Sequence, residues 1–186
     1  MCEATKRPEG ADLLNDRLLE KRKLFVFGSI DSKIAQKVIS SLIFLCEEKP
    51  DEKITLYINA EGGSQTEALG IYDVMRNLSC PVETVCMGKA HGMAALLLAG
   101  GTKGLRKAYA NSEIMLMQIG HERTFGQASD IERATEHLLQ SKNRINGIFA
   151  ALCEKTAEEI TAVSDRKFWL YAEEAKNFGL IDEVIE

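Results

Sequence analysis

The sequence lacks an apolar stretch long enough to cross a bilayer. Its longest such run, residues 93–99, is far shorter than the ~20 residues that a transmembrane helix needs. The first ten residues are polar and have no apolar core of the kind found in secretory signal peptides. The 23 basic residues are scattered and form no stripe with interleaved aromatic residues. We therefore expect neither a membrane nor a nucleic acid as a partner.

Cysteine and histidine patterns typical of metal centres are also missing. The five cysteines are odd in number and include no CxxC pair. Cys46, Cys86 and Cys153 fall within apolar runs, where cysteine behaves as a small hydrophobic residue. The three histidines are far apart and do not follow a zinc-ligand spacing. The sequence thus predicts a reducing compartment and no metal or other cofactor.

What is present is the composition of an ordinary globular domain: 45% apolar and 27% charged residues in a chain of 186, with a net charge of −5. Short apolar runs alternate with segments whose apolar residues recur at helical spacing. We expect strands at residues 24–27, 54–58, 82–87, 107–109, 114–117 and 181–185, and helices after Asp31 and at residues 66–75, 93–99, 157–163 and 172–178. This alternation predicts an α/β fold with a largely parallel sheet and helices on its faces.

A single long helix is expected from Gln127 to about Leu152. Its apolar seam is spaced alternately three and four residues apart, a pattern suited to helix–helix contact. The mean helix is only ~11–12 residues long, so this helix is unusual. The helix either lies across its own domain or projects from it to meet a partner subunit.

The segment after residues 82–87 has the frame of a nucleophile-presenting turn but no nucleophile. We expect a tight turn from Gly88 to Gly92 and then a buried helix, an arrangement that presents a serine beside backbone N–H donors in hydrolases. Gly92 occupies the presenting position and has no side chain to react. A second turn, at Gly62 and Gly63, could supply further N–H groups to the same point. The residues alone therefore suggest an oxyanion hole with nothing to use it.

None of the three histidines stands beside a hydroxyl or thiol in the sequence. His91 adjoins the vacant turn, but its neighbour is Gly92. His121 lies in a polar loop, and His137 lies among polar residues that are typical of a solvated helix face.

Several motifs, in order and spacing, make the chain resemble the proteolytic subunits of the caseinolytic Clp peptidase, the ClpP family. They are residues 57–63 (YINAEGG), 70–73 (GIYD), 86–93 (CMGKAHGM), 98–104 (LAGGTKG), 126–130 (GQASD) and 173–182 (EEAKNFGLID). The resemblance runs from about Leu14 to Ile185. It implies a crotonase-like spiral of ββα units, with a mostly parallel sheet and a protruding handle of one strand and one helix at about 118–152. Residues 1–13 are then a flexible tail, and residues 14–186 form a single domain.

The resemblance places the family's catalytic Ser, His and Asp on Gly92, Met117 and Lys167. None of the three can perform its role, since glycine cannot attack, methionine cannot accept a proton and lysine carries the wrong charge. The family's oxyanion donors fall on Gly63 and Met93, where Glu61 replaces the usual proline and is expected to crowd the hole. A one-residue insertion in the loop 120–125 puts the peptide groove in doubt.

Positions that the family uses for assembly are better preserved. Arg166 matches an arginine of the ring–ring contact. Tyr57, Val85, Met87 and Tyr109 match the pocket where an AAA+ unfoldase docks. Asn77 and Lys107 replace apolar positions of that pocket, so weaker or altered docking is expected, because burying unpaired polar groups costs a few kcal/mol.

This combination resembles ClpR, the family's non-catalytic branch in cyanobacteria and plastids. It implies an inactive subunit that joins active ClpP subunits in a two-ring, fourteen-subunit protease core, through which protein substrates pass. The location implied is a bacterial cytoplasm or a plastid stroma. Two alternatives remain: a crotonase-type enzyme that acts on acyl thioesters through the oxyanion hole alone, and a homomeric structural ring.

Overall fold

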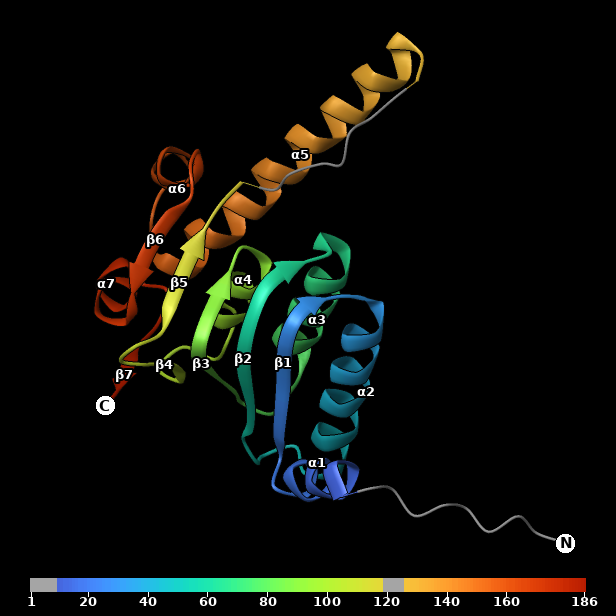
Figure 1. Cartoon of the computed structure of the whole chain (residues 1–186), viewed down its shortest axis with the longest axis vertical. Coiled ribbons are helices and arrows are strands. Elements are labelled where there is room, and N and C mark those ends of the chain that lie inside the picture. The colour runs from blue at the N-terminus through green and yellow to red at the C-terminus, as the bar shows by residue number, and fades with distance from the viewer. Residues whose placement is uncertain (1–9, 119–125) are drawn as a thin grey trace, which may run out of the picture.

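The computed structural model describes residues 10–118 and 126–186. Strands and helices alternate through most of this part of the chain (Figure 1). The strands are β1 (Lys23–Ile30), β2 (Ile54–Gly63), β3 (Val82–His91), β4 (Arg106–Tyr109), β5 (Glu113–Leu116), β6 (Phe168–Tyr171) and β7 (Glu183–Ile185). The helices are α1 (Gly10–Glu20), α2 (Ser32–Glu48), α3 (Gln65–Asn77), α4 (Met93–Ala99), α5 (Ala128–Cys153), α6 (Ala157–Ser164) and α7 (Ala172–Phe178).

The seven strands form one mixed sheet. Its main path is β1-β2-β3-β4-β7, and β5 joins it by pairing with β3 on one side and β6 on the other. Every pairing is parallel except that of β5 with β6, which is antiparallel. The predicted α/β class with a mostly parallel sheet is therefore confirmed.

The core lies between the sheet and the helices α2, α3 and α4. Alternate residues of β2, such as Leu56 and Ile58, point into it, as expected for a strand with one face buried. Helix α4 is buried along its whole length beneath β2 and β3. Among the described residues, no helix is both long and apolar enough to span a membrane.

Helix α5 projects away from the sheet, as Figure 1 shows. Its C-terminal part is anchored in the core through Ile145, Phe149 and Cys153, whereas residues 128–144 are exposed or half-buried. Of the two interpretations of the long helix, the structure agrees with projection.

The predicted tight turn between Gly88 and Gly92 is wrong. Strand β3 continues to His91 and changes partner, pairing with β4 at residues 84–86 and with β5 at residues 89–91. Gly88 lies at the change with a φ of 91°, a conformation that favours glycine. The turn is confined to Gly92. Strand β1 likewise continues past Gly28 to Ile30, and β2 includes Gly62 and ends at Gly63.

Two elements, α1 and β6, were not predicted, and the predicted boundaries of the tail and of the last strand are wrong. Helix α1 begins at Gly10, so residues 10–13, assigned to a flexible tail, lie in a helix, and residues 1–9 are outside the described part. Strand β6 completes the sheet beside β5. The last strand begins at Glu183, two residues later than predicted.

Candidate functional site

A cavity of about 650 Å³ lies where the end of β2, the start of α4 and the inner side of α5 meet. Three of its lining residues belong to the apolar seam of α5, namely Leu138, Ile145 and Phe149. The rest of the lining comes from the two glycine turns and the end of β5: Glu61, Gly62, Gly63, Ser64, Gln65, Thr66, Gly92, Met93, Met117 and Gln118, with His137 and Ser141 from α5. The projecting helix thus forms one wall of a groove at the carboxyl end of the sheet.

Gly92 and Met117 face each other inside this cavity. A methyl group built on Gly92 would lie 3.5 Å from Met117 Cγ and 3.6 Å from its sulfur. Gly92 has a φ of 53° and a ψ of −115°, and its N–H donates to Met115 O at 2.8 Å. This strained strand-to-helix turn is the kind that exposes a nucleophile in hydrolases. Side chains at positions 92 and 117 could therefore touch, but glycine cannot act as a nucleophile and methionine cannot act as a base.

Lys167 lies on the strand side of the same region but does not line the cavity. β5 and β6 pair antiparallel with Leu116 opposite Phe168, so the next pair along this register is Met117 and Lys167. Nearby, Gln118 Nε2 donates to Asp165 Oδ1 at 2.7 Å, which holds the end of β5 against the segment before β6. An acid at position 167 would stand beside residue 117, where a lysine now brings a positive charge.

The two glycine turns approach each other closely. A methyl group built on Gly62 would lie 3.1 Å from His91 O and 3.6 Å from the backbone nitrogen of Met93. Met93 is the first residue of α4, so its N–H has no acceptor within the helix. These contacts place Gly62 beside Met93, and both Gly63 and Met93 line the cavity. That the N–H groups of Gly63 and Met93 together stabilise an oxyanion remains a prediction.

Gly63 is also held by the fold, and we expect Gly63→Ala to destabilise the protein by more than 3 kcal/mol. A methyl group there would lie 2.3 Å from Ile30 O, an overlap that requires the β1–β2 pair to separate. Gly28→Ala is the matched control, because Gly28 also has a positive φ but a methyl group there meets nothing within 4 Å, so a cost of about 1 kcal/mol is expected. Urea unfolding of both variants measures the difference, and equal losses would contradict the steric explanation.

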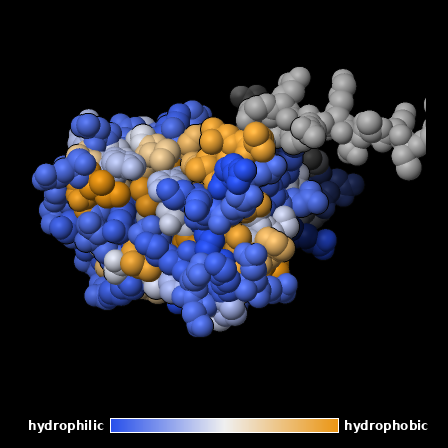
Figure 2. Space-filling view, turned by 90° about the horizontal axis from the view of Figure 1, so that it is seen from below, coloured by the Kyte–Doolittle hydropathy of each residue, from blue (hydrophilic) through white to orange (hydrophobic). Residues whose placement is uncertain are grey.

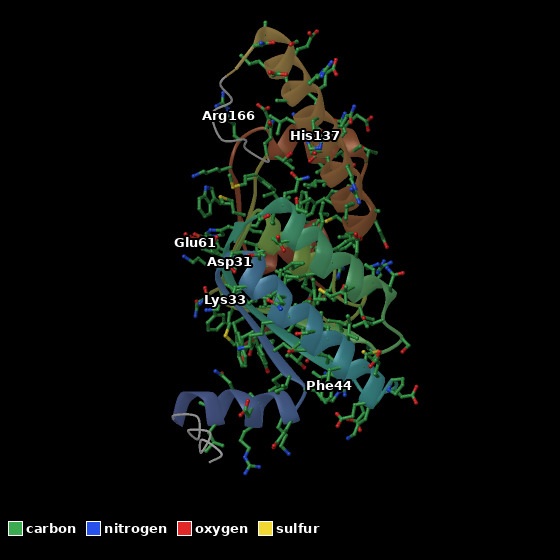
Figure 3. The ribbon with its side chains drawn as sticks, turned by 90° about the vertical axis from the view of Figure 1, so that its right-hand side faces the viewer. Asp31, Lys33, Phe44, Glu61, His137 and Arg166 are labelled. Carbon is green, nitrogen blue, oxygen red and sulfur yellow. The ribbon has the colours of Figure 1, made fainter. Side chains whose placement is uncertain are left out.

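Glu61 was expected to crowd the oxyanion hole, but its carboxylate is held elsewhere. Its carboxylate pairs with Lys89 Nζ on β3, and this contact lowers the pKa of Glu61. The side chain is 68% exposed, although the residue borders the cavity. Figure 3 shows Glu61 at the same edge of the sheet as Asp31 and Lys33. The negative charge is therefore partly neutralised by a neighbour.

The histidines lie differently from what their sequence neighbours suggested. His91 is buried, its Nε2 lies 3.1 Å from Glu113 Oε1, and its ring packs edge-on against Trp169. His137 is exposed as predicted, but it faces the cavity, one helical turn before Ser141. Neither His137 nor Ser141 was predicted to line the cavity. Both residues flank the apolar seam of α5, whose members line the same cavity, and this was the signal that the sequence offered. His121 and the loop 120–125 lie outside the described residues.

No replacement for a catalytic pair is seen. Within residues 10–118 and 126–186, no serine, threonine or cysteine side chain hydrogen-bonds to a histidine, the one side-chain partner of an imidazole being Glu113. The same residues contain no cluster of three potential metal ligands.

The outer face of the sheet carries the residues matched to unfoldase docking. Tyr57 stacks on Phe25 with ring centroids 5.4 Å apart, and Val85 and Lys107 follow in the same row across β3 and β4. The Lys107 amine lies 2.7 Å from Glu183 Oε2 and 3.8 Å from Glu83 Oε1. These contacts raise the pKa of Lys107, so its charge is paired rather than free in the apolar surface.

The residues matched to assembly differ in exposure, and Val85 is only 3% exposed. Met87 is half-buried and Tyr109 is 40% exposed, each two residues further along its strand from Val85 and Lys107. Arg166 is exposed and lies at the same end of the molecule as the projecting helix (Figure 3).

The described residues thus form a mostly parallel sheet with a cavity beneath a projecting helix and two glycine turns at the edge of that cavity. The family model described as Clp protease matches residues 6–186, nearly the whole chain. The chain therefore belongs to the Clp protease family.

Proposed function

We propose that this chain is a catalytically inactive subunit of a Clp protease core, which assembles in rings with active ClpP-type subunits. The observation that carries the proposal is the pairing of Gly92 with Met117 across the cavity. By resemblance to the family, these two positions are those of the nucleophile and its base, and neither glycine nor methionine has the chemistry that either role needs. What the chain retains is the body, the projecting helix and the outer sheet face.

A peptidase assay of the purified chain tests inactivity. We expect no turnover of a fluorogenic dipeptide or tripeptide above background. Turnover that a serine-directed phosphonate abolishes would refute the proposal. An active ClpP-type subunit assayed in the same buffer is the positive control.

Co-assembly requires a separate measurement. We expect native mass spectrometry of the tagged chain, isolated from its own cells, to show complexes that also contain a subunit with an intact triad. Complexes made only of this chain would instead support the homomeric ring. Calorimetric binding of a coenzyme A thioester would favour the crotonase-type alternative, for which the backbone donors of Gly63 and Met93 at the cavity are the motivating feature.

We infer that the surface matched to unfoldase docking is altered at Lys107 and Asn77 but can still bind an unfoldase. The row from Phe25 through Tyr57 to Val85 remains apolar, and the ion pairs of Lys107 lower the cost of having a charge at its end. Asn77 is exposed, and its amide donates to Asp73 O at 2.7 Å within α3. The expected result is docking that is altered in strength at this subunit while other subunits of the ring bind normally.

We expect Arg166→Ala to weaken the stacking of two rings without unfolding the chain. The residue is exposed and carries no ion pair to another described residue, so its loss removes little from the subunit itself. Native mass spectrometry of the co-assembled complex should show a shift from double to single rings. Arg17→Ala, which removes an exposed charge on α1, is the control. An unchanged double ring in the Arg166 variant would contradict the inter-ring role.

A further inference from the structure

Two buried thiols meet between the end of α2 and the segment that precedes β3. Cys46 is 6% exposed and Cys80, directly before Pro81, is 3% exposed. Their side chains lie within hydrogen-bonding contact of each other. Cys46 Sγ also lies 3.3 Å from Ser79 Oγ. The assembly proposed above makes no use of this pair.

The two thiols differ in acidity. Burial alone would raise the pKa of Cys46, but hydrogen bonds from Ser79 and Cys80 outweigh it, and the pKa lies below its ordinary value. Burial and the neighbouring Cys46 raise the pKa of Cys80 to about 11. Cys46 is therefore the more acidic thiol of the pair, and the thiolate is the reactive form of cysteine.

A positive charge lies close to the pair. The Arg22 guanidinium donates to Leu45 O at 2.8 Å and to Lys49 O at 3.1 Å, so it rests against the last turn of α2, and its charge acts on Cys80. Arg22 is itself buried. This charge lowers the pKa of Cys80, which burial otherwise raises, and so favours attack by the Cys80 sulfur on an oxidised Cys46.

We propose that Cys46 and Cys80 are a reversible oxidation site that closes to a disulfide under peroxide. The Cys46 thiolate attacks one peroxide oxygen, the O–O bond breaks, and hydroxide leaves, giving a sulfenic acid on Cys46. The Cys80 sulfur then attacks the Cys46 sulfur. The S–O bond breaks, and the departing oxygen takes the Cys80 proton to leave as water. Each disulfide thus consumes one peroxide, and a dithiol reductant reverses it.

The link would covalently fasten α2 to the segment between α3 and β3. The same turn of α2 carries Ile43 and Phe44, which are 41% and 59% exposed. Phe44 lies near the lower end of the molecule in Figure 3, and Figure 2 shows apolar patches on the face seen from below. Oxidation at Cys46 would therefore restrain the helix end that presents an exposed apolar pair. In a reducing compartment such a bond would be transient.

The other described cysteines provide internal controls. Burial raises the pKa of Cys86 to about 12 and that of Cys153 to about 11, and each lacks a second thiol beside it. We expect both to stay reduced at peroxide concentrations that oxidise the pair.

The test uses the full folded chain with Cys2→Ser to remove a cysteine outside the described residues. After graded hydrogen peroxide, alkylation under denaturing conditions and digestion, mass spectrometry should find a Cys46–Cys80 linked peptide, two hydrogens lighter than its parts. Dithiothreitol should remove it. In the Cys80→Ala variant, the same treatment should leave sulfenic or more oxidised forms on Cys46, and Cys86→Ala should behave as the parent.

The proposal fails if Cys86 or Cys153 is oxidised before the pair, or if Cys46 reaches sulfinic acid while Cys80 stays free. A second measurement does not depend on any variant of the pair. The oxidised parent should melt at a higher temperature than the reduced one, and dithiothreitol should reverse the shift. No shift together with no linked peptide would overturn the inference.

Discussion

Gly92→Ser alone is expected to leave the chain without measurable peptidase activity. The side chain would fit, since a methyl group at this position makes ordinary contacts with Met117 at 3.5–3.6 Å. The backbone conformation, with a φ of 53°, costs about 1–3 kcal/mol for a residue other than glycine, and hydrolases tolerate this at their nucleophile. A serine hydroxyl is a weak nucleophile without a base, however, and Met117 cannot accept its proton.

Restoring the base and the acid should change the result. The triple variant G92S/M117H/K167D is expected to exceed the single variant by about 10²-fold to 10⁴-fold in peptide turnover, the contribution typical of a positioned general base. The measurement is hydrolysis of a fluorogenic peptide, with circular dichroism to show that both variants fold.

Among the described residues, His137 is the histidine that lines the cavity, and it supplies a direct control. His137 faces the same space as Gly92, whereas His91 is turned toward Glu113 and Trp169. If Gly92→Ser alone cleaves peptide, the further change His137→Ala should abolish that activity, and His137 would be the base. That outcome would contradict the expectation that the single substitution is insufficient.

The order of strands and helices could be predicted because each element has a clear apolar period. Strand ends were less predictable. Gly88 and Gly62 were interpreted as stops, but in parallel strands a glycine with positive φ can turn the chain while pairing continues, as β3 does when it exchanges β4 for β5. Strand β6 was missed because four residues after a helix give too short a pattern, and α1 because its apolar residues Leu13 and Leu14 are exposed.

In the candidate site, too, features set by neighbouring residues could be predicted, and contacts between distant parts of the chain could not. Local turns predicted that Gly63 and Met93 could contribute N–H groups, because glycines and helix starts are visible in the sequence. That residue 92 faces residue 117 followed from the family resemblance, since no local spacing relates a turn to a strand formed later in the chain. The path of α5 across the groove, and with it His137, is set by packing of Ile145 and Phe149 on the core. The spacing of apolar residues within α5 does not predict which residues lie opposite its apolar seam.

Replacing Arg106 should destabilise the fold strongly. Its guanidinium is 5% exposed and binds Asp182 through Nη2 at 2.6 Å and Nε at 2.9 Å. It also donates to Leu152 O and Gly179 O, which joins β4 to the ends of α5 and α7. Arg106→Met should therefore lower the free energy of unfolding by about 3–5 kcal/mol, because it leaves a largely buried carboxylate without its partner. Since Leu152 belongs to the base of the projecting helix, loosening of α5 should accompany the loss.

The pH dependence of this loss separates the ion pair from simple packing. Burial would raise the pKa of Asp182, but Arg106 and the Gly104 N–H outweigh it, so the folded pKa lies below the unfolded value. A lowered carboxyl pKa contributes stability that is present above about pH 4 and is lost as the pH falls through the folded pKa. The difference in the free energy of unfolding between the parent and Arg106→Met should thus be largest at neutral pH. It should become smaller in acid, where the unpaired Asp182 carboxyl of the variant takes up a proton. Urea unfolding at neutral pH and near pH 4 measures this difference.

The control is Arg17→Met, which breaks an exposed pair with Glu20 and should cost no more than about 1 kcal/mol at either pH. An equal gap at both pH values would mean that Arg106 stabilises the fold by packing and by its carbonyl contacts, and not through the charge of Asp182.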